Sequence, residues 1–222
     1  MIVAIDGPSG AGKSTLAKKL AEKLGFIYLD TGAMYRALAL KILRQEVDLA
    51  DEPKLTQLVN STAVDLQGDG AELRVILDGE NVASEIRTPV VSQMASKASA
   101  LKVVRDRMLE LQRRLGERGS VVAEGRDIGT VVFPDAQVKI FLNASAAERA
   151  RRRYAELRAA GQPVDVEVTL REIEERDKRD SERALAPLRK AADALMIDSS
   201  NSTADEIAAC VLAEIRMKQN EI

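Results

Sequence analysis

The sequence predicts an α/β fold with a five-stranded parallel sheet that is covered by helices on both faces. Short apolar, β-branched runs alternate along the chain with longer segments of helical periodicity, the usual pattern of a parallel sheet with crossover helices. A glycine-rich loop at residues 7–15 lies between the first such run and the first such helix. With 222 residues, the chain is long enough to bury a proper core, either as one domain with an insertion or as two small domains.

The elements follow in order from the first residues. Residues 2–5 form an apolar run that predicts a buried strand, and leucines at helical spacing then predict a helix that ends at Gly25. Residues 26–29 predict a second strand, which leads to a helix beginning near Ala33. Pro53 interrupts the helical pattern, and a further run continues to about residue 60.

A change of periodicity marks an insertion. Leu73, Val75 and Leu77 alternate with polar neighbours and are followed by Asp78-Gly79, a hairpin signal. We therefore expect residues 60–88 to be a small insertion with its own sheet. The core then comprises residues 1–59 and 89–222.

The second half returns to alternating strands and helices. Pro89 opens a helical stretch that carries Ser96 and Arg105 and ends near residues 116–119. The predicted strands are residues 121–123, 138–142 and 194–197, and Thr203 or Asp205 begins the final helix. Ligands of such a sheet bind beyond the carboxyl ends of its strands, so residues 30–31 and 125–127 should converge with the glycine-rich loop.

That loop matches the phosphate-binding pattern of a glycine, four free positions, then glycine, lysine and serine or threonine. Its backbone N–H groups and the following helix N-terminus would hold a triphosphate. Lys13 would reach the β and γ phosphates, and the Ser14 hydroxyl would bind Mg²⁺. The expected ATP-binding residues of the loop are Gly7, Pro8, Ser9, Gly10, Ala11, Gly12, Lys13, Ser14 and Thr15. The alternative is a glycine-rich turn without a ligand.

Composition narrows the chemistry. The chain has no histidine and one cysteine, which excludes a histidine-based acid or base and an internal disulfide. We expect Cys210 to be buried on the last helix. The net charge of −2 argues against a protein that coats nucleic acid. With no leader before the first strand, no apolar run that could span a bilayer and no apolar seam, we expect a cytoplasmic monomer.

Dense mixed charge marks residues 148–185. One interpretation is a pair of solvated helices with ion pairs four residues apart. The other is a mobile helical lid that closes arginines over the triphosphate. The suitably placed arginines are Arg36, Arg126, Arg152, Arg153, Arg176 and Arg183.

These arginines indicate the acceptor. An alcohol needs a positioned base to attack ATP, whereas a phosphate monoester is largely ionised at pH 7 and needs its charge neutralised. Guanidinium groups do this and also stabilise the charge on the transferring phosphoryl group. The composition therefore favours a nucleoside monophosphate kinase.

Four segments carry a family resemblance: residues 30–36 (DTGAMYR), 86–88 (IRT), 124–134 (EGRDIGTVVFP) and 176–180 (RDKRD). In identity and order they resemble the bacterial cytidylate kinase family, from the phosphate loop nearly to the C-terminus. The resemblance implies an adenylate-kinase-like core that binds ATP and Mg²⁺, with residues 60–88 as an insertion that binds the acceptor nucleotide and with a mobile lid. It implies an enzyme that converts CMP or dCMP to CDP or dCDP in pyrimidine nucleotide metabolism.

The resemblance also implies roles for individual residues. The matching residues hold the acceptor phosphate (Thr31, Arg36, Arg126), read the cytosine edge (Ser96, Arg105, Asp127), contact the sugar and phosphates (Arg176, Asp180, Arg183), or reach ATP from the lid (Arg152 or Arg153). We expect Lys13, Arg126, Arg153 and Arg183 to act on the transferring phosphoryl group. Many members of the family have aspartate where this chain has Glu124, which leaves a direct metal contact by Glu124 open.

Several of these residues also have a purely structural interpretation. Asp127 would be a helix cap, Ser96 and Arg105 ordinary polar residues of a helix, and Glu124 a structural partner of an arginine.

Two other functions share the phosphate loop. A small-molecule kinase acting on an alcohol, such as a shikimate or nucleoside kinase, would phosphorylate a substrate that lacks phosphate. A nucleotide-controlled switch or transporter motor would be a slow ATPase. The guanine-reading Asn-Lys-x-Asp and the transporter signature Leu-Ser-Gly-Gly-Gln are both absent from the sequence.

Overall fold

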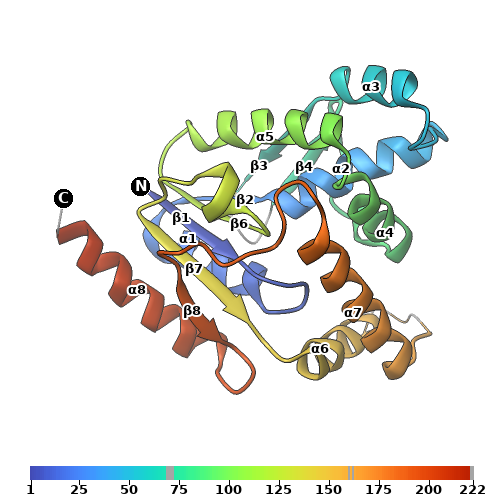
Figure 1. The fold of residues 1–222 in the computed structure, drawn as a ribbon. Helices are drawn as coiled ribbons and strands as arrows, with labels where there is room; N and C mark the ends of the chain where they lie inside the picture. The colour runs from blue at the N-terminus through green and yellow to red at the C-terminus, as the bar shows by residue number, and fades with distance from the viewer. Residues whose placement is uncertain (69–72, 160, 162, 221–222) are drawn as a thin grey trace.

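The computed structural model describes residues 1–68, 73–159, 161 and 163–220, so residues 69–72 of the predicted insertion and 160 and 162 of the predicted lid lie outside the described residues. Its centre is a parallel sheet in the order β2-β6-β1-β7-β8 (Figure 1). The strands are β1 (Ile2–Asp6), β2 (Ile27–Asp30), β6 (Val121–Gly125), β7 (Val138–Asn143) and β8 (Leu195–Asp198). The predicted fold class is confirmed, including the five strands and their parallel pairing.

Helices cover both faces of this sheet because side chains alternate along each strand. On β1, Ala4 packs into one apolar cluster, whereas Val3 and Ile5 pack into another on the opposite face. The helices are α1 (Lys13–Leu24), α2 (Thr31–Arg44), α3 (Glu52–Asn60), α4 (Pro89–Ala98), α5 (Lys102–Gly116), α6 (Ala146–Ala159), α7 (Val166–Glu182) and α8 (Ala204–Asn220). The first cluster includes α2 to α5, and the second includes α1 and α8.

The predicted β excursion forms a separate antiparallel sheet of three short strands, β3 (Val64–Gln67), β4 (Arg74–Leu77) and β5 (Glu80–Asn81). The apolar side chains of β3 and β4 belong to the same cluster as those of α2. This small sheet therefore packs on the helix that carries Arg36.

Several boundaries differ from the sequence predictions. Asp30 caps α2 by accepting from the N–H of Ala33, so the helix begins at Thr31. Pro53 lies in the first turn of α3, where a missing N–H costs nothing. The stretch after Pro89 is two helices, because the chain leaves the helical conformation at Leu101.

One burial prediction is wrong: Cys210 is exposed. The buried residues of α8 include Ile207, Ala208 and Val211, and Cys210 lies outside that stripe. None of the helices in the described part of the chain is long and apolar enough to cross a membrane.

Helices α6 and α7 lie against each other at one end of the molecule, beyond the carboxyl ends of β1 and β7 (Figure 1). The turn after β6 leads into a short π-helix, η2 (Ile128–Val132). The phosphate loop, this turn and the α6–α7 pair thus border one region of the sheet edge.

Candidate active site

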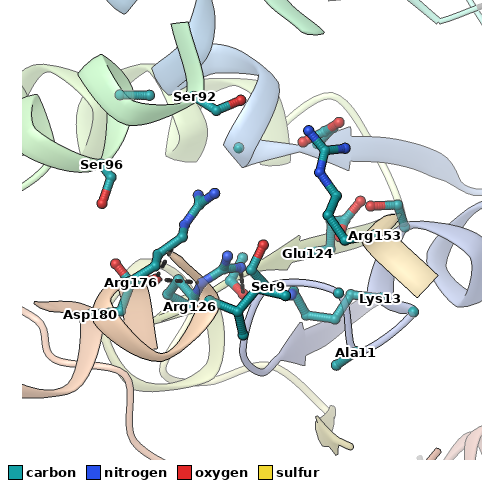
Figure 2. A pocket seen from close by; sticks show the side chains of 18 of the residues that line it. Ser9, Ala11, Lys13, Ser92, Ser96, Glu124, Arg126, Arg153, Arg176 and Asp180 are labelled. Atoms are coloured by element: carbon teal, nitrogen blue, oxygen red, sulfur yellow. Dashed lines mark hydrogen bonds and ion pairs between the residues drawn. The ribbon is translucent and has the colours of Figure 1, made fainter. Parts of the chain in front are cut away.

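A cavity of about 1070 Å³ opens at the carboxyl edge of the sheet. It is lined by the phosphate loop, by the turn after β6, by α4 and by the α6–α7 pair. In Figure 2, Lys13 and Ser9 lie on one side of this space, Ser92 and Ser96 on another, and Arg126 and Arg176 beside Asp180. Among the described residues of 60–88, Arg87 alone lines the cavity.

The conformation of the phosphate loop requires its glycines. Gly7 has φ +149°, and a Cβ there would lie 1.9 Å from the carbonyl oxygen of Leu142. Gly12, with φ +91°, occupies the left-handed region at the N-cap of α1. The loop can therefore turn sharply into α1 and present backbone N–H groups at the helix N-terminus, an arrangement that suits a phosphate.

Lys13 extends back along this loop. Its Nζ donates to the carbonyl oxygen of Pro8 at 2.7 Å, and the residue is buried. Burial, reinforced by the positive charge of Arg126, lowers the pKa of Lys13 to about 7. A bound polyanion would reverse this shift, because it favours the charged amine.

Glu124 is the next-to-last residue of β6 and lies near Ser14 at the start of α1. Tyr28 donates its hydroxyl proton to Oε1 of Glu124, and Thr31 donates to the Glu124 carbonyl oxygen at 2.7 Å. Burial, with the charge of Asp30 adding to it, raises the pKa of the Glu124 carboxyl. The positive charge of Lys13 opposes this rise. Glu124 is thus paired with a tyrosine rather than with an arginine, and its carboxylate lies near the Ser14 hydroxyl.

The three predicted base-reading residues, Ser96, Arg105 and Asp127, line the same cavity. Arg105 donates from Nη2 to Oδ2 of Asp127, and both residues are buried. Arg183 lies across from them, with its Nη2 at 3.6 Å from Oδ1 of Asp127. The side chain of Asp127 makes no cap bond to η2. The Oγ of Ser96 is buried without a hydrogen-bond partner and belongs to a residue that lines the cavity.

A second group gathers positive charge around one carboxylate. Arg126 donates from Nε to Oδ2 of Asp180 at 2.9 Å, and Nε of Arg176 lies 3.9 Å from the same oxygen. Burial, together with the charge of Arg126, lowers the pKa of Arg176 to about 10. Arg36 also lines the cavity and donates to Asp30 at 3.3 Å. This excess of cations in a partly buried cavity favours a polyanionic ligand.

Arg152 and Arg153, the two arginines predicted to reach ATP from a lid, both line the cavity but have different partners. Arg152 donates to the carbonyl oxygen of Ser199 at 2.6 Å and to Oε1 of Glu148 at 2.9 Å, so its guanidinium is held at the rim near Gly12. Arg153 lines the cavity and pairs with Glu156 at 3.2 Å. Of the two, Arg153 has fewer bonds to break in order to reach a phosphate.

Sequence reasoning missed three residues that support the site. Asp6 accepts from the N–H groups of Ile128 and Gly129, at 2.7 and 2.8 Å, and so holds the turn after β6. Tyr28 holds Glu124, as described above. Arg149 contacts the phosphate loop. A charged residue at the end of a buried strand was the available signal for Asp6, since a buried carboxylate needs partners.

Comparison with known proteins agrees with this geometry. A family model described as cytidylate kinase matches residues 3–217. A relative named cytidylate kinase from Pelotomaculum thermopropionicum is 52% identical over 220 residues, covering 99% of this chain and 97% of the relative. Another of that name, from Carboxydothermus hydrogenoformans, is 48% identical over 222 residues and covers 100% of both chains.

Among solved structures, an uncharacterized protein from Eubacterium ventriosum is similar, with a TM-score of 0.52 and 16% identity. The match covers 97% of this chain and 98% of that one. At this identity the likeness shows the fold alone.

Proposed function

The chain belongs to the cytidylate kinase family, and we propose that it transfers the γ-phosphoryl group of ATP, bound with Mg²⁺, to CMP or dCMP. One observation carries the assignment of the acceptor. The buried Arg105–Asp127 pair and the unpartnered Ser96 hydroxyl line the same cavity as the phosphate loop, with the cations around Asp180 also lining it.

The base pocket suits cytosine. The exocyclic amine of cytosine is a donor, and its O2 and N3 are acceptors. Asp127 and Ser96 can accept from that amine, and Arg105 can donate to the ring. Arg183 and Asp180 would then hold the sugar, with Thr31, Arg36, Arg126 and Arg176 around the acceptor phosphate.

Transfer needs no protein base. The acceptor phosphate is largely ionised at pH 7, so its oxygen can attack the γ-phosphorus directly and in line. What the protein must supply is position and positive charge. Lys13, Arg126 and Arg153 would stabilise the charge on the transferring phosphoryl group. The α6–α7 pair belongs to the proposed lid of residues 148–185, and its closure would exclude water.

Mg²⁺ fits the oxygen-rich start of α1. This cation prefers oxygen ligands and usually keeps several waters when it is bound to a nucleotide. Ser14 would be its protein ligand, and the Glu124 carboxylate, which interacts with the Ser14 hydroxyl, would orient that hydroxyl. Mg²⁺ held by Ser14 would supply positive charge that offsets the negative charge of the phosphates.

The division of the chain is part of this proposal. Residues 1–59 and 89–222 would form the kinase core, and residues 60–88 would support the acceptor side through α2. We further propose that the protein is cytoplasmic, since both substrates are free nucleotides, and that it is a monomer.

The deciding experiment measures ADP formation from ATP and Mg²⁺ with each nucleoside monophosphate in turn, including deoxy forms, an alcohol substrate and a control without acceptor. CMP and dCMP should stimulate turnover strongly, and AMP and GMP little. Stimulation by an alcohol alone would indicate the alcohol-kinase alternative. A slow rate that no acceptor changes would instead indicate a switch or motor.

Asp127→Ala tests the base pocket in the same assay. The Michaelis constant for CMP should rise far more than that for ATP, because Arg105 and Arg183 lose the carboxylate that orients them. An equal effect on both substrates would remove Asp127 from the pocket.

A further inference from the structure

Arg149 begins the second turn of α6, where one guanidinium joins three parts of the chain. Its Nε donates to the carbonyl oxygen of Ala144 at 3.0 Å, and its Nη1 donates to that of Ser9 at 3.1 Å. Its Nη2 donates to Oδ2 of Asp177 on α7 at 2.6 Å. Arg149 is 5% exposed, so water cannot easily replace these bonds.

The bond to Ser9 controls the geometry of the phosphate loop. In a trans peptide, the C=O of one residue and the N–H of the next point in opposite directions. No cis peptide is found in the described residues, so a Ser9 carbonyl held by Arg149 directs the Gly10 N–H away from Arg149. The loop and α6 are also in close contact, because a Cβ at Gly10 would lie 3.1 Å from Cβ of Arg149.

The bond to Asp177 connects Arg149 to α7, the helix on the acceptor side of the cavity. Asp177 is adjacent to Arg176 and lies about one helical turn before Asp180, which accepts from Arg126 at 2.9 Å. Any shift of α7 would therefore move both Arg176 and Asp180 relative to the phosphate loop. In this structure the Arg149–Asp177 pair links α7 to the phosphate loop, since one planar guanidinium donates to all three acceptors.

We propose that Arg149 is a positioning residue that holds the phosphate loop in register with the acceptor-side helix α7. This inference rests on the proposed function, because α7 contacts an acceptor only if the enzyme phosphorylates a nucleoside monophosphate. In-line transfer demands that donor and acceptor oxygens meet within a narrow range, and displacement by about 1 Å can cost 100-fold in rate. Arg149 would act through the loop and the helix, without touching either substrate.

A purely structural pair would behave differently. Its loss would lower the free energy of unfolding but would leave the fate of the γ-phosphoryl group unchanged in the folded fraction. A positioning role predicts that the group is lost more often to water, because a misplaced acceptor competes less well. The ratio of ADP formed to CDP formed, measured with CMP present, separates the two.

Arg149→Met and Arg149→Lys test the proposal, with Arg151→Met as the matched control. Arg151 lies on the same helix, its side chain is 71% exposed, and it pairs with Glu148. Arg149→Met should lower kcat by about 100-fold and raise the ratio of ADP to CDP. Arg149→Lys should rescue little, because an ammonium group cannot reproduce the three-way fork. Arg151→Met should stay within about twofold of the parent protein.

Asp177→Asn provides a second test in case Arg149→Met does not fold. It keeps the shape of the side chain but removes the charge, so the ratio of ADP to CDP should still rise. A normal ratio in either folded variant would overturn the proposal.

The two proposals fail in different ways. A parent protein that forms no CDP would refute the proposed function. The amide resonance of Gly10 reports on the loop without any acceptor, and it should shift in Arg149→Met but not in Arg151→Met. An unshifted resonance would refute the role of Arg149 while leaving the proposed function intact.

Discussion

The surroundings of Lys13 disfavour the charged form of its amine. Burial, with the charge of Arg126, lowers its pKa to about 7, whereas a bound triphosphate would raise it. Below pH 7 the amine is already charged before ATP binds. Above pH 7 it is neutral in the protein alone and charged in the complex, so binding must take up a proton and weaken as pH rises.

Calorimetry of ATP binding at pH 8, in buffers with different ionisation enthalpies, measures this uptake. The parent protein should take up close to one proton more than Lys13→Arg, whose guanidinium stays charged at this pH. Equal uptake by the two proteins would mean that Lys13 is charged before the nucleotide arrives.

Tyr28 favours the ionised form of the Glu124 carboxylate by donating a hydrogen bond to it. Burial, followed by the charge of Glu124, raises the pKa of Tyr28, so its hydroxyl stays a donor at any working pH. Tyr28→Phe removes that bond and disfavours the ionised carboxylate. The Mg²⁺ concentration for half-maximal turnover should rise, more at pH 6 than at pH 8, and stability should fall by about 1–3 kcal/mol.

Tyr154→Phe is the control for this change, because Tyr154 is a partly exposed residue of α6 outside the cavity lining. Titrations of activity with Mg²⁺, together with urea unfolding, provide both measurements. If Tyr28→Phe alters stability alone, Glu124 has a structural role and no part in metal binding.

At the scale of elements, Asp6 ties the end of β1 to η2 through two backbone N–H groups. Burial raises the pKa of Asp6 to about 6, although the bonds from Gly129 and Ile128 pull it down. A folded-state pKa above the ordinary value of 3.8 means that the folded protein binds the proton more tightly. The contribution of Asp6 to stability is therefore complete below about pH 4 and is lost as pH rises through 6.

Asp6→Asn should remove this pH dependence. The amide can accept from only one of the two N–H groups, so the variant should be less stable than the parent protein by about 1–3 kcal/mol. The difference in the free energy of unfolding between the parent protein and Asp6→Asn should become smaller from pH 4 to pH 7, as measured by urea unfolding at each pH. A difference that widens with pH would show that ionised Asp6 is the more stabilising form.

The elements also show what sequence can predict here. The strands were predictable because each is a short β-branched run, and the alternation of side chains such as Val121, Val122 and Ala123 between the two clusters follows from their burial on both faces. The π-helix η2 was not, because its residues 128–132 include a β-branched run that resembles a strand. Its conformation depends on tertiary contacts, namely the hydrogen bonds to Asp6 and the Lys139 side chain beside Gly129.

The same limit applies to the site. Motif spacing predicted that the phosphate loop would meet residues 30–31 and 125–127, because the carboxyl ends of parallel strands share one edge of the sheet. The site residues of α4, α5 and α7, which also line the cavity, were expected from the family resemblance. Neither predicted which arginines would already be paired. Arg149 and Arg152 are indistinguishable in a run of arginines. In the structure, Arg149 donates to the carbonyl oxygen of Ser9 in the phosphate loop, whereas Arg152 donates to that of Ser199.

For the whole molecule, the cationic cluster around Asp180, formed by Arg126 and Arg176, lowers the stability of the free protein but is needed for activity. Arg176 is charged at pH 7 whether the chain is folded or unfolded, so a pKa lowered to about 10 means that folding must tolerate this charge among other cations. Asp180 does not depend on it, because Arg126 donates to the same carboxylate at 2.9 Å. The cluster is useful only when an anionic substrate is present.

Arg176→Met should therefore make the protein more stable and less active. The free energy of unfolding in urea should rise by roughly 0.5–2 kcal/mol, while kcat with CMP should fall by about 100-fold or more, because the acceptor phosphate loses a cation that neutralises it for attack. Arg171→Met, an exposed position on the same helix, should change neither quantity appreciably. If Arg176→Met unfolds at lower urea than the parent protein, the ion pair with Asp180 stabilises the free protein by more than the repulsion among the arginines costs.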